Sequence, residues 1–327
     1  MMDNLAPHKT DLERARVAQD AAPVRIRAAR PEDRPAMERI CAQTWDWGDY
    51  VPEVWDGWLA GVARSPAIGS SEVGVLIVGE WEGQVVALSR IDFQTRDQVW
   101  LEAMRVDPDY RRRGIAGQFL DYSINFALER GARVVRLGTG GNNTPVHLIA
   151  ARAGMERVGI YVQWNAEPLP EGSPLVCLAP GQEARLLAFL DGSRVLAHTR
   201  GLYSVDWAWQ ELTAERAVQF LAAGQVAAHY PQEIGLAALA LIHADPDGEE
   251  LWIGFADGQF QAVADLATRI RTSAARQGIG KVRVMLPDLE WLRDAFRTAG
   301  YGPGDWEGEL WIFEGQLYQE GEGTHDR

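Results

Sequence analysis

The segment best suited to chemistry runs from Asp107 to Gly117, where three consecutive arginines precede a run of small residues. Its sequence is DPDYRRRGIAG. Arg111 to Arg113 supply positive charge, and Gly114, Ala116 and Gly117 keep side-chain bulk away from the backbone. Where such a backbone opens a helix, its unpaired N–H groups and partial positive charge attract an anion. We therefore predict a loop that binds a diphosphate.

The alternative for this segment is a basic turn that only caps a helix. The loop is not a P-loop, because no Gly-Lys-Ser/Thr closes it, and it lacks the G-x-G-x-x-G of a dinucleotide fingerprint. Its flanks favour phosphate binding, since VWLEAMRV at 99–106 is an apolar strand and helical spacing follows over about 115–129. Gly131 would cap that helix at its C-terminal end.

Neighbouring elements must hold this strand and helix in place. In order, we expect a strand at 24–30, a helix at 31–44, two strands within 73–93 joined at Glu82-Gly83, the strand and helix above, a strand at 133–139, a short helix at 145–154 and a strand at 156–166. Three strands in succession make an antiparallel meander. The first half is therefore predicted to be a mixed α/β unit.

The second half repeats this element order. Segment 263–286 matches 123–137, and 296–301 matches 150–155, while strand-then-helix returns at 204–221 and the hairpin at 237–255. We therefore predict two copies of one fold. The expected boundaries are a tail at 1–22, a first domain at 23–167, a connection with one short helix at 168–202, a second domain at 203–320 and a tail at 321–327.

Two motifs at the expected distance carry a family resemblance. Arg111-x-x-Gly114-x-Ala116 resembles the R/Q-x-x-G-x-G/A signature of the GNAT superfamily of acyl-CoA-dependent N-acyltransferases. A second set matches the spacing of the family's N-x-x-A-x-x-L-Y-x-x-x-G-F segment: Asn143, Val146, Ile149, Gly154 and Met155. The resemblance covers residues 24–166, and 204–318 only as fold pattern. It implies an α/β (α+β) fold, a mixed and mostly antiparallel sheet with helices on both faces, duplicated in tandem.

The same resemblance implies acetyl-coenzyme A as cosubstrate and no metal. The diphosphate would lie on the arginine loop, and pantetheine amides would pair with the backbone of the preceding strand. The cofactor-binding residues are then Met104, Arg105, Val106, Arg111, Arg112, Arg113, Gly114, Ile115, Ala116, Gly117 and Asn143. Asn143 would fix either the cofactor or the adjoining loop.

Glu102 matches an acidic residue that in some family members accepts the amine proton. A neutral amine is required for attack, so a carboxylate there has a chemical role. The alternatives are a solvated residue or one paired with Arg105 or Arg111. The family's Tyr, a general acid toward the leaving thiolate, falls on Ala150. Either another group or water protonates the sulfur, or the protein does not turn over in the usual way.

The acceptor side is predicted from an aromatic-rich stretch. Its members, Trp45, Trp47, Tyr50, Trp55 and Trp58, suit either core packing or a substrate wall, and we take Trp47 and Tyr50 as substrate-binding candidates. Together with EAMRVDP and RRRGIAG, GDYVPEVWDGWL at 48–59 is similar to the subgroup that contains histidine N-acetyltransferases. That similarity implies the α-amine of an amino acid as acceptor.

The second copy lacks the arginine run. If Trp252 to Phe255 takes the position of Glu102 to Arg105, its loop is ADGQFQAVADL at 256–266, without small residues at both cradle positions. One cofactor site per chain is therefore expected. The second copy would pack on the first, complete the acceptor pocket or mediate dimerisation.

Composition limits the classes of partner. The net charge is −14 and the lysines are Lys9 and Lys281 alone, which disfavours nucleic acid and mildly favours a cationic or neutral substrate. Cys41, Cys177 and six scattered His suggest neither a disulfide framework nor a zinc site. No apolar run reaches a membrane span and no secretory signal opens the chain, so we expect a soluble, cytoplasmic monomer or homodimer.

The expected function is thus transfer of an acetyl group from acetyl-CoA to a primary amine of a small molecule, in a ternary complex. The alternatives are a non-catalytic acyl-CoA sensor or scaffold, favoured by Ala150, and a protein or antibiotic N-acetyltransferase.

Overall fold

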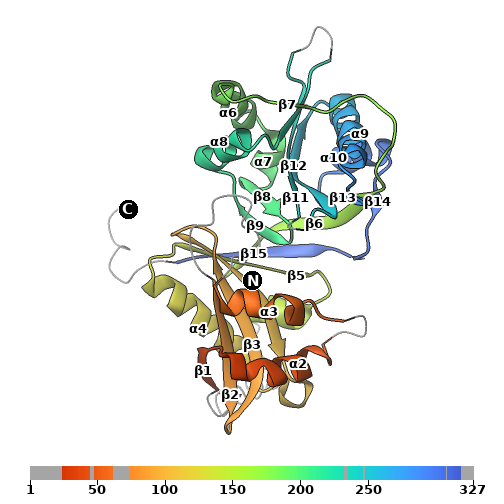
Figure 1. Ribbon diagram of the computed structural model, residues 1–327. Coiled ribbons are helices and arrows are strands. Elements are labelled where there is room, and N and C mark those ends of the chain that lie inside the picture. Colours follow the sequence, from red (N-terminus) through yellow and green to blue (C-terminus); the bar gives the residue numbers. More distant parts are fainter. Residues whose placement is uncertain are drawn as a thin grey trace, which may run out of the picture.

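A mixed sheet of 13 strands runs through both halves of the chain (Figure 1). The computed structural model describes residues 24–44, 48–61, 74–231, 235–245, 247–306 and 308–317. The strand order is β1-β2-β3-β4-β5-β15-β6-β13-β12-β11-β10-β7, with β14 paired to β6, and β8 and β9 form a separate hairpin. Among the described helices, none is long and apolar enough to cross a bilayer.

The first half contains the predicted meander. Its strands are β1 (Arg25–Ala28), β2 (Val75–Trp81), β3 (Gln84–Phe93), β4 (Gln98–Val106) and β5 (Val134–Gly140). Neighbours from β1 to β4 are antiparallel, whereas β4 and β5 are parallel. The predicted turn at Glu82-Gly83 is confirmed, since both residues have the positive φ angles of a tight hairpin, 50° and 81°.

Helices cover both faces of this sheet, as the sequence predicted. The helices are α2 (Arg34–Cys41), α3 (Val51–Leu59), α4 (Ile115–Glu129) and α5 (Thr144–Arg152), with 3-10 turns η1 (Pro31–Asp33) and η2 (Pro108–Tyr110). One cluster of buried side chains joins α2 and α3 to the sheet, and another joins α4 and α5 to it. The α2–α3 face and the α4–α5 face are therefore distinct environments for the side chains of β4.

The second half has the same core pattern, so the tandem duplication is confirmed. Its elements are β7 (Val176–Cys177), α6 (Glu183–Asp191), α7 (Arg194–His198), β8 (Leu202–Val205), β9 (Ala208–Glu211), α8 (Ala214–Ala222), β10 (Val226–His229), β11 (Ala238–Ala244), β12 (Glu250–Gly258), α9 (Phe260–Arg276), β13 (Lys281–Pro287), α10 (Glu290–Thr298), β14 (Gly302–Pro303) and β15 (Leu310–Gln316). The β12–β13 pair is parallel, like β4–β5. Segment 168–202 contains two helices, α6 and α7, where one was expected.

The two halves share strands at their boundary. β15, the last strand in sequence, lies between β5 and β6 (Glu156–Ala166) and pairs antiparallel with both. β6 in turn pairs with β13 of the second half, so Tyr161 lies opposite both Leu310 and Pro287. Figure 1 shows β15 crossing the middle of the molecule. β15 of the second half thus pairs within the first half, and β6 of the first half pairs with the second. The domain boundaries predicted from the sequence therefore cut through one continuous sheet.

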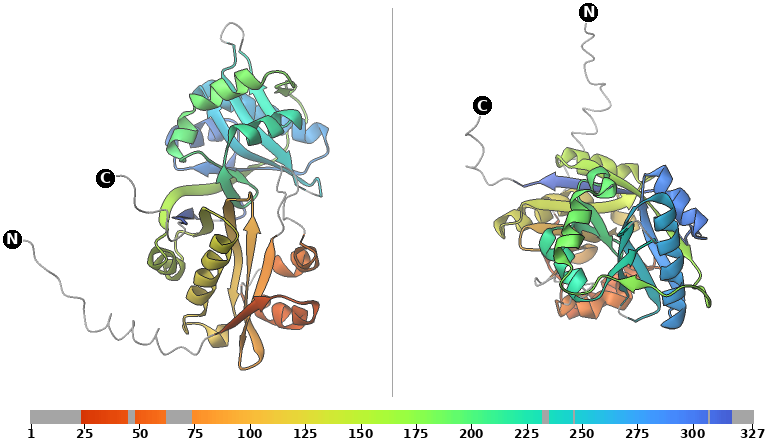
Figure 2. Two further views of the ribbon diagram at one scale, coloured as in Figure 1. Left: turned by 90° about the vertical axis from the view of Figure 1, so that its left-hand side faces the viewer. Right: turned by 90° about the horizontal axis from the view of Figure 1, so that it is seen from above.

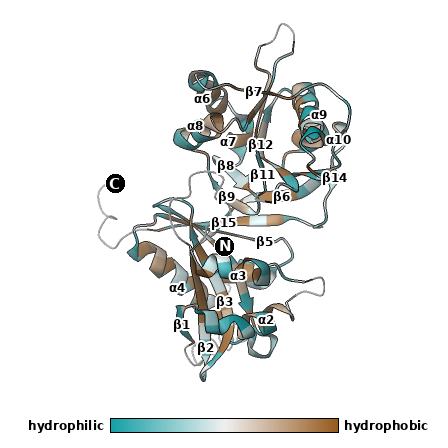
Figure 3. Ribbon diagram, viewed as in Figure 1, coloured by the Kyte–Doolittle hydropathy of each residue, from teal (hydrophilic) through white to brown (hydrophobic). Residues whose placement is uncertain are grey.

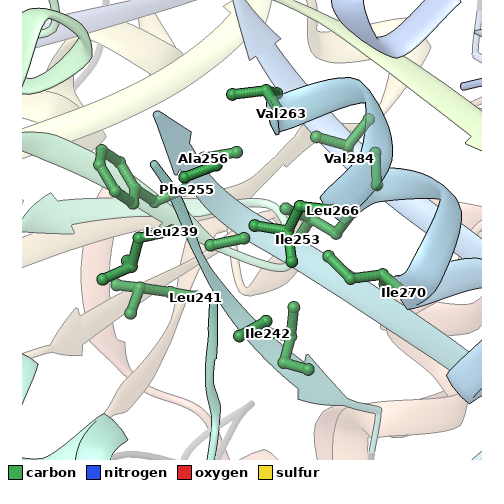
Figure 4. Packing of buried hydrophobic residues seen from close by; sticks show 14 of the residues in the cluster. Leu239, Leu241, Ile242, Ile253, Phe255, Ala256, Val263, Leu266, Ile270 and Val284 are labelled. Carbon is green, nitrogen blue, oxygen red and sulfur yellow. The ribbon is translucent and has the colours of Figure 1, made fainter. Parts of the chain in front are cut away.

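Apolar side chains of the sheet and α9 form the core of the second half. Ile253 of β12 lies beside Leu266 and Ile270 of α9, whereas Leu239 and Leu241 of β11 point to the other face of the sheet with Phe255 (Figure 4). Figure 3 shows apolar stretches along the strands and mixed hydropathy along the covering helices. The left-hand view of Figure 2 shows the two halves arranged end to end. The second half is therefore a well-packed unit whose strand order matches the first.

Candidate functional site

The strands β4 and β5 separate halfway along their length. They pair over four positions, from Gln98 opposite Val134 to Leu101 opposite Leu137, and no further pairing joins them in the described chain. Beyond that point β5 continues its pairing with β15. The edge of β4 that faces β5, over residues 102–106, is left without a strand partner there. Met104, Arg105 and Val106 lie on this edge, where the sequence predicted backbone pairing with pantetheine.

A bulge in β4 changes which side chains share a face. Ala103 has a left-handed φ of 57°, and the register with β3 shifts between Leu88 and Arg90. In a regular strand, residues three apart point to opposite faces, but an extra residue reverses that alternation. As a result, Glu102 and Arg105 both face the α2–α3 side, since their partners lie on β3 and near α3. The bulge thus brings two charged side chains to one side of the separated strand.

The arginine loop joins β4 to α4 with the backbone curvature of an anion site. Arg112 and Gly114 both have positive φ, 63° and 76°, so the chain turns sharply before α4. Such turns point successive N–H groups toward one concavity. The first N–H groups of α4 have no side-chain cap. A Cβ added to Gly114 or Gly117 would meet no atom within 4 Å, so the space in front of this helix end is open.

The three loop arginines have different environments. Arg111 donates from Nε to the carbonyl of Val106 at 3.1 Å, and Arg113 donates to the carbonyl of Asp109 at 3.0 Å. Arg113 also lies over the Tyr110 ring at 5.0 Å. Within the residues that the structure describes, the exposed guanidinium of Arg112 makes no hydrogen bond or ion pair. Two arginines therefore shape the loop, and Arg112 leaves its charge available to an anion.

The start of α4 is fixed by burial on its inner side. Ile115 is 1% exposed and packs in the core beneath the helix, whereas Ala116 and Gly117 are half-buried. The apolar anchor and the small residues thus occupy different sides of the first turn. This arrangement keeps the helix end rigid while an anion approaches its N–H groups.

Glu102 pairs with a residue that sequence reasoning missed. Its Oε1 lies 3.4 Å from Nε of Arg90, which stands directly opposite on β3. Of the partners expected for Glu102, Arg105 instead binds Asp49 at 2.7 Å, and Arg111 binds a backbone carbonyl. An arginine within the otherwise apolar run QVVALSRIDF was the available signal, because a buried strand tolerates a charge only when a partner faces it.

In the aromatic-rich stretch at 45–58, some side chains lie in the core and one borders the candidate site. Trp55 and Trp58 are buried in the core beneath α3. The half-buried Tyr50 packs edge-on against Trp58, with ring centroids 6.0 Å apart, and lies 5.7 Å from the guanidinium carbon of Arg105. Tyr50 thus borders the same charged face as Glu102. Trp47, with Trp45, lies outside the described residues.

Asn143 fixes the loop between β5 and α5. Its Nδ2 donates to Thr139 Oγ1 at 2.9 Å, which ties the end of β5 to the first turn of α5. Ala150, at the position of the family's Tyr, is fully buried and faces the core. One turn earlier, His147 stacks on Trp311 of β15, with ring centroids 4.5 Å apart. Ala150 therefore offers no group that could protonate a leaving thiolate.

The second copy lacks both the acidic residue of β4 and the arginine loop. Trp252 is the third residue in the parallel pairing of β12 with β13, and Trp100 is the third in the pairing of β4 with β5. By this register, Gly254 occupies the position of Glu102. The expected alignment of Trp252 with Glu102 is therefore wrong by two residues. A Cβ on Gly254 would overlap the carbonyl oxygen of Ser204 on β8. Only Gln259 separates β12 from α9, which leaves no loop for a diphosphate.

The chain itself fills the gap where β12 and β13 separate. Side chains of α7 and β8, including Val195, Thr199 and Leu202, pack between Phe255 of β12 and Leu286 of β13. The cavity left among them is about 10 Å³, roughly what one water molecule needs. Pantetheine could enter only if α7 moved away.

Comparison with known proteins agrees with this architecture. Residues 34–155 match the model of the acetyltransferase (GNAT) family. A GCN5-related N-acetyltransferase from Sphaerobacter thermophilus superposes with a TM-score of 0.60 at 15% identity, over 90% of this chain and 95% of that one. A tandem GNAT protein from the clavulanic acid biosynthesis pathway has a TM-score of 0.53 at 13% identity, over 90% and 98%. No curated protein matches the chain in sequence.

Proposed function

Because residues 34–155 form a GNAT acetyltransferase domain, we propose that this chain moves an acetyl group from acetyl-CoA to the primary amine of a small molecule, with an amino acid as the leading candidate. The observation that carries the proposal is the open anion site at the start of α4. It combines an uncapped helix end, left-handed turns at Arg112 and Gly114, and the available charge of Arg112.

The donor would lie along the separated edge of β4. A diphosphate on the N–H groups of α4 places the rest of the molecule beside Met104, Arg105 and Val106, whose β5-facing edge has no strand partner in the described chain. Extended amides pair readily with such an edge. Small residues at Ala116 and Gly117 allow close approach of the phosphates. At Gly114 and Gly117 the approaching phosphates would meet open space.

The acceptor would approach from the α2–α3 face. Glu102, Tyr50 and the Asp49–Arg105 pair lie on that face, beside the bulge at Ala103. Glu102 would take a proton from the ammonium group. The neutral nitrogen then bonds to the thioester carbonyl carbon and the carbon–sulfur bond breaks. The nitrogen gives up its second proton to solvent as the amide forms, and the thiolate leaves with its electron pair and takes up a proton. Since Ala150 carries no acid, either another group or water would protonate the sulfur.

Positioning supplies most of the acceleration in such a direct transfer, because holding amine and thioester together replaces a bimolecular encounter. The second half supports that positioning. Trp209 of β9 packs against Trp100 of β4 at 6.0 Å, and Arg216 donates to the carbonyl of Gln94 at 2.7 Å. The β8–β9 hairpin thus lies against the N-terminal half of β4, which pairs with β5 before the two strands separate.

A non-catalytic acyl-CoA-binding protein is the second candidate, and the burial of Ala150 is the observation in its favour. Glu102, at the bulge, favours the enzyme. The test measures thiol release from acetyl-CoA with a panel of primary amines that includes histidine. Amine-dependent release supports transfer, whereas stoichiometric binding of acetyl-CoA without release from any amine supports the second candidate.

A further inference from the structure

A buried arginine connects two carboxylates on the acceptor face. Arg90 of β3 is fully buried, with its guanidinium carbon 4.7 Å from the centre of the Trp58 ring. Its Nη2 donates to Asp92 Oδ1 at 2.8 Å, whereas its Nε lies at the longer distance of 3.4 Å from Glu102 Oε1. Asp92 is therefore the tighter of these two partners of Arg90.

The local sequence dictates this geometry. Arg90 and Asp92 are two residues apart on one strand, so their side chains share a face, and Glu102 is directly across the ladder from Arg90. Gly74 closes the cluster from the other side. A Cβ there would lie 2.6 Å from the guanidinium carbon and 2.7 Å from Asp92 Oδ1, so the backbone packs directly on the pair.

Within the described part of the chain, charged side chains on the face of Glu102 come from β3 and from the start of α3. Arg90 attracts a negative charge on Glu102, while Asp92 repels it. Further along the same face, Asp49 and Arg105 neutralise each other at 2.7 Å. The thiol of Cys41 on α2 stays neutral, because burial, with the nearby Asp49, raises its pKa to about 12. Arg90 and Asp92 are therefore the described charges through which we expect the ionisation of Glu102 to be adjusted.

We propose that Arg90 is a positioning residue for acyl transfer, which holds the Glu102 carboxylate ionised and aimed along the bulge, and that Asp92 adjusts its basicity by sharing Arg90. The proposal rests on the proposed role of Glu102 as the base. An unshared arginine would hold the Glu102 proton affinity too low for a base. Without the arginine, two buried carboxylates would repel each other and favour protonation.

Opposite shifts in a pH profile test this assignment. The experiment follows kcat/KM for the full chain against pH, with saturating acetyl-CoA and the best amine of the panel. Asp92→Asn removes a negative charge that competes with Glu102 for Arg90, so the acid limb should move down by about 0.5 to 1 pH unit. Arg90→Met removes that charge, so the limb should move up by about 1 to 2 units. A residue with a purely structural role would lower the rate without these opposite shifts.

The controls separate the two levels of the proposal. Glu102→Gln must remove the acid limb; if it keeps the full rate and the limb, the base role fails, and with it the basis of this inference. If Glu102→Gln removes the limb but Asp92→Asn leaves it unmoved, Arg90 and Asp92 do not adjust Glu102, and only this inference is overturned. Should Arg90→Met not fold, Asp92→Asn decides alone, because it retains the buried guanidinium and its contact with Trp58.

Discussion

Ser193 donates a hydrogen bond of 2.5 Å to the buried carboxylate of Asp257, and this contact closes the second copy against a cofactor. The same carboxylate accepts from the backbone N–H of Val195 at 3.1 Å, so the end of β12 caps the start of α7. α7 then fills the gap between β12 and β13. In the described residues, the arginine loop at the start of α4 therefore has no counterpart at the start of α9.

Removing this contact should weaken the fold but not the binding of acetyl-CoA. Ser193→Ala deletes a buried hydrogen bond to a charged group, so we expect the free energy of unfolding to fall by about 1.5 to 3 kcal/mol. Chemical denaturation measures that loss, and calorimetry should still find one acetyl-CoA per chain with unchanged affinity. A clear drop in affinity would mean that the second copy contributes to the cofactor site.

Bulk at Gly114 should block the cofactor. Gly114 has a φ of 76° with open space beyond it, and Gly131, at the other end of α4, has a φ of 86° and equally open space. Val at either position pays a similar backbone cost. We expect Gly114→Val to weaken acetyl-CoA binding at least about tenfold, or 1.4 kcal/mol. Gly131→Val should bind normally in the same calorimetric titration; equal losses in both variants would point to general damage instead.

Arg112 should act through its charge alone. Arg112→Gly retains the left-handed backbone, which glycine adopts freely, and removes a guanidinium that makes no described contact. We expect the Kd for acetyl-CoA to rise about 3- to 10-fold at low salt, with a smaller difference at high salt because exposed charges are screened. Arg130→Ala, at the far end of α4, is the matched control. An unchanged Kd for Arg112→Gly would remove this residue from the site.

The first half should not fold without the last strand. Ending the chain after Glu309 deletes β15, which exposes the edges of both β5 and β6 and removes the buried Ile312 and Phe313. We expect loss of cooperative unfolding and of acetyl-CoA binding. A chain that ends after Leu317 keeps β15 and should behave as the full chain. Folding and binding by the shorter chain would contradict the exchange of strands.

The sequence predicted the local elements of the first half well. Helix α4 and strand β6 match their expected ranges. The spacing of apolar residues and the glycines at element ends are local signals, which lie within about 15 residues of the element that they determine. The GNAT resemblance also predicted the tandem fold. The roles of Glu102, Asn143, Tyr50 and the loop residues remain predictions, although their positions are now defined.

The pairing of strands that lie far apart in the sequence could not be predicted in the same way. Nothing in LWIFEGQ indicates that β15 pairs in the sheet of the other half, since any edge strand of that pattern pairs equally well. The partnership of Arg90 with Glu102 depends on strand register, which the bulge at Ala103 shifts. The alignment of Trp252 with Glu102 failed for the same reason, because residue similarity carries no information on register.

Amine-dependent release of thiol from acetyl-CoA tests the central claim most directly. With the full chain and a panel of primary amines that includes histidine, we predict steady release with at least one amine. At subsaturating acetyl-CoA, Gly114→Val should reduce that release at least about tenfold, in line with its weaker binding. Binding of one acetyl-CoA per chain with no thiol released by any amine would contradict transfer and leave a protein that only binds acyl-CoA.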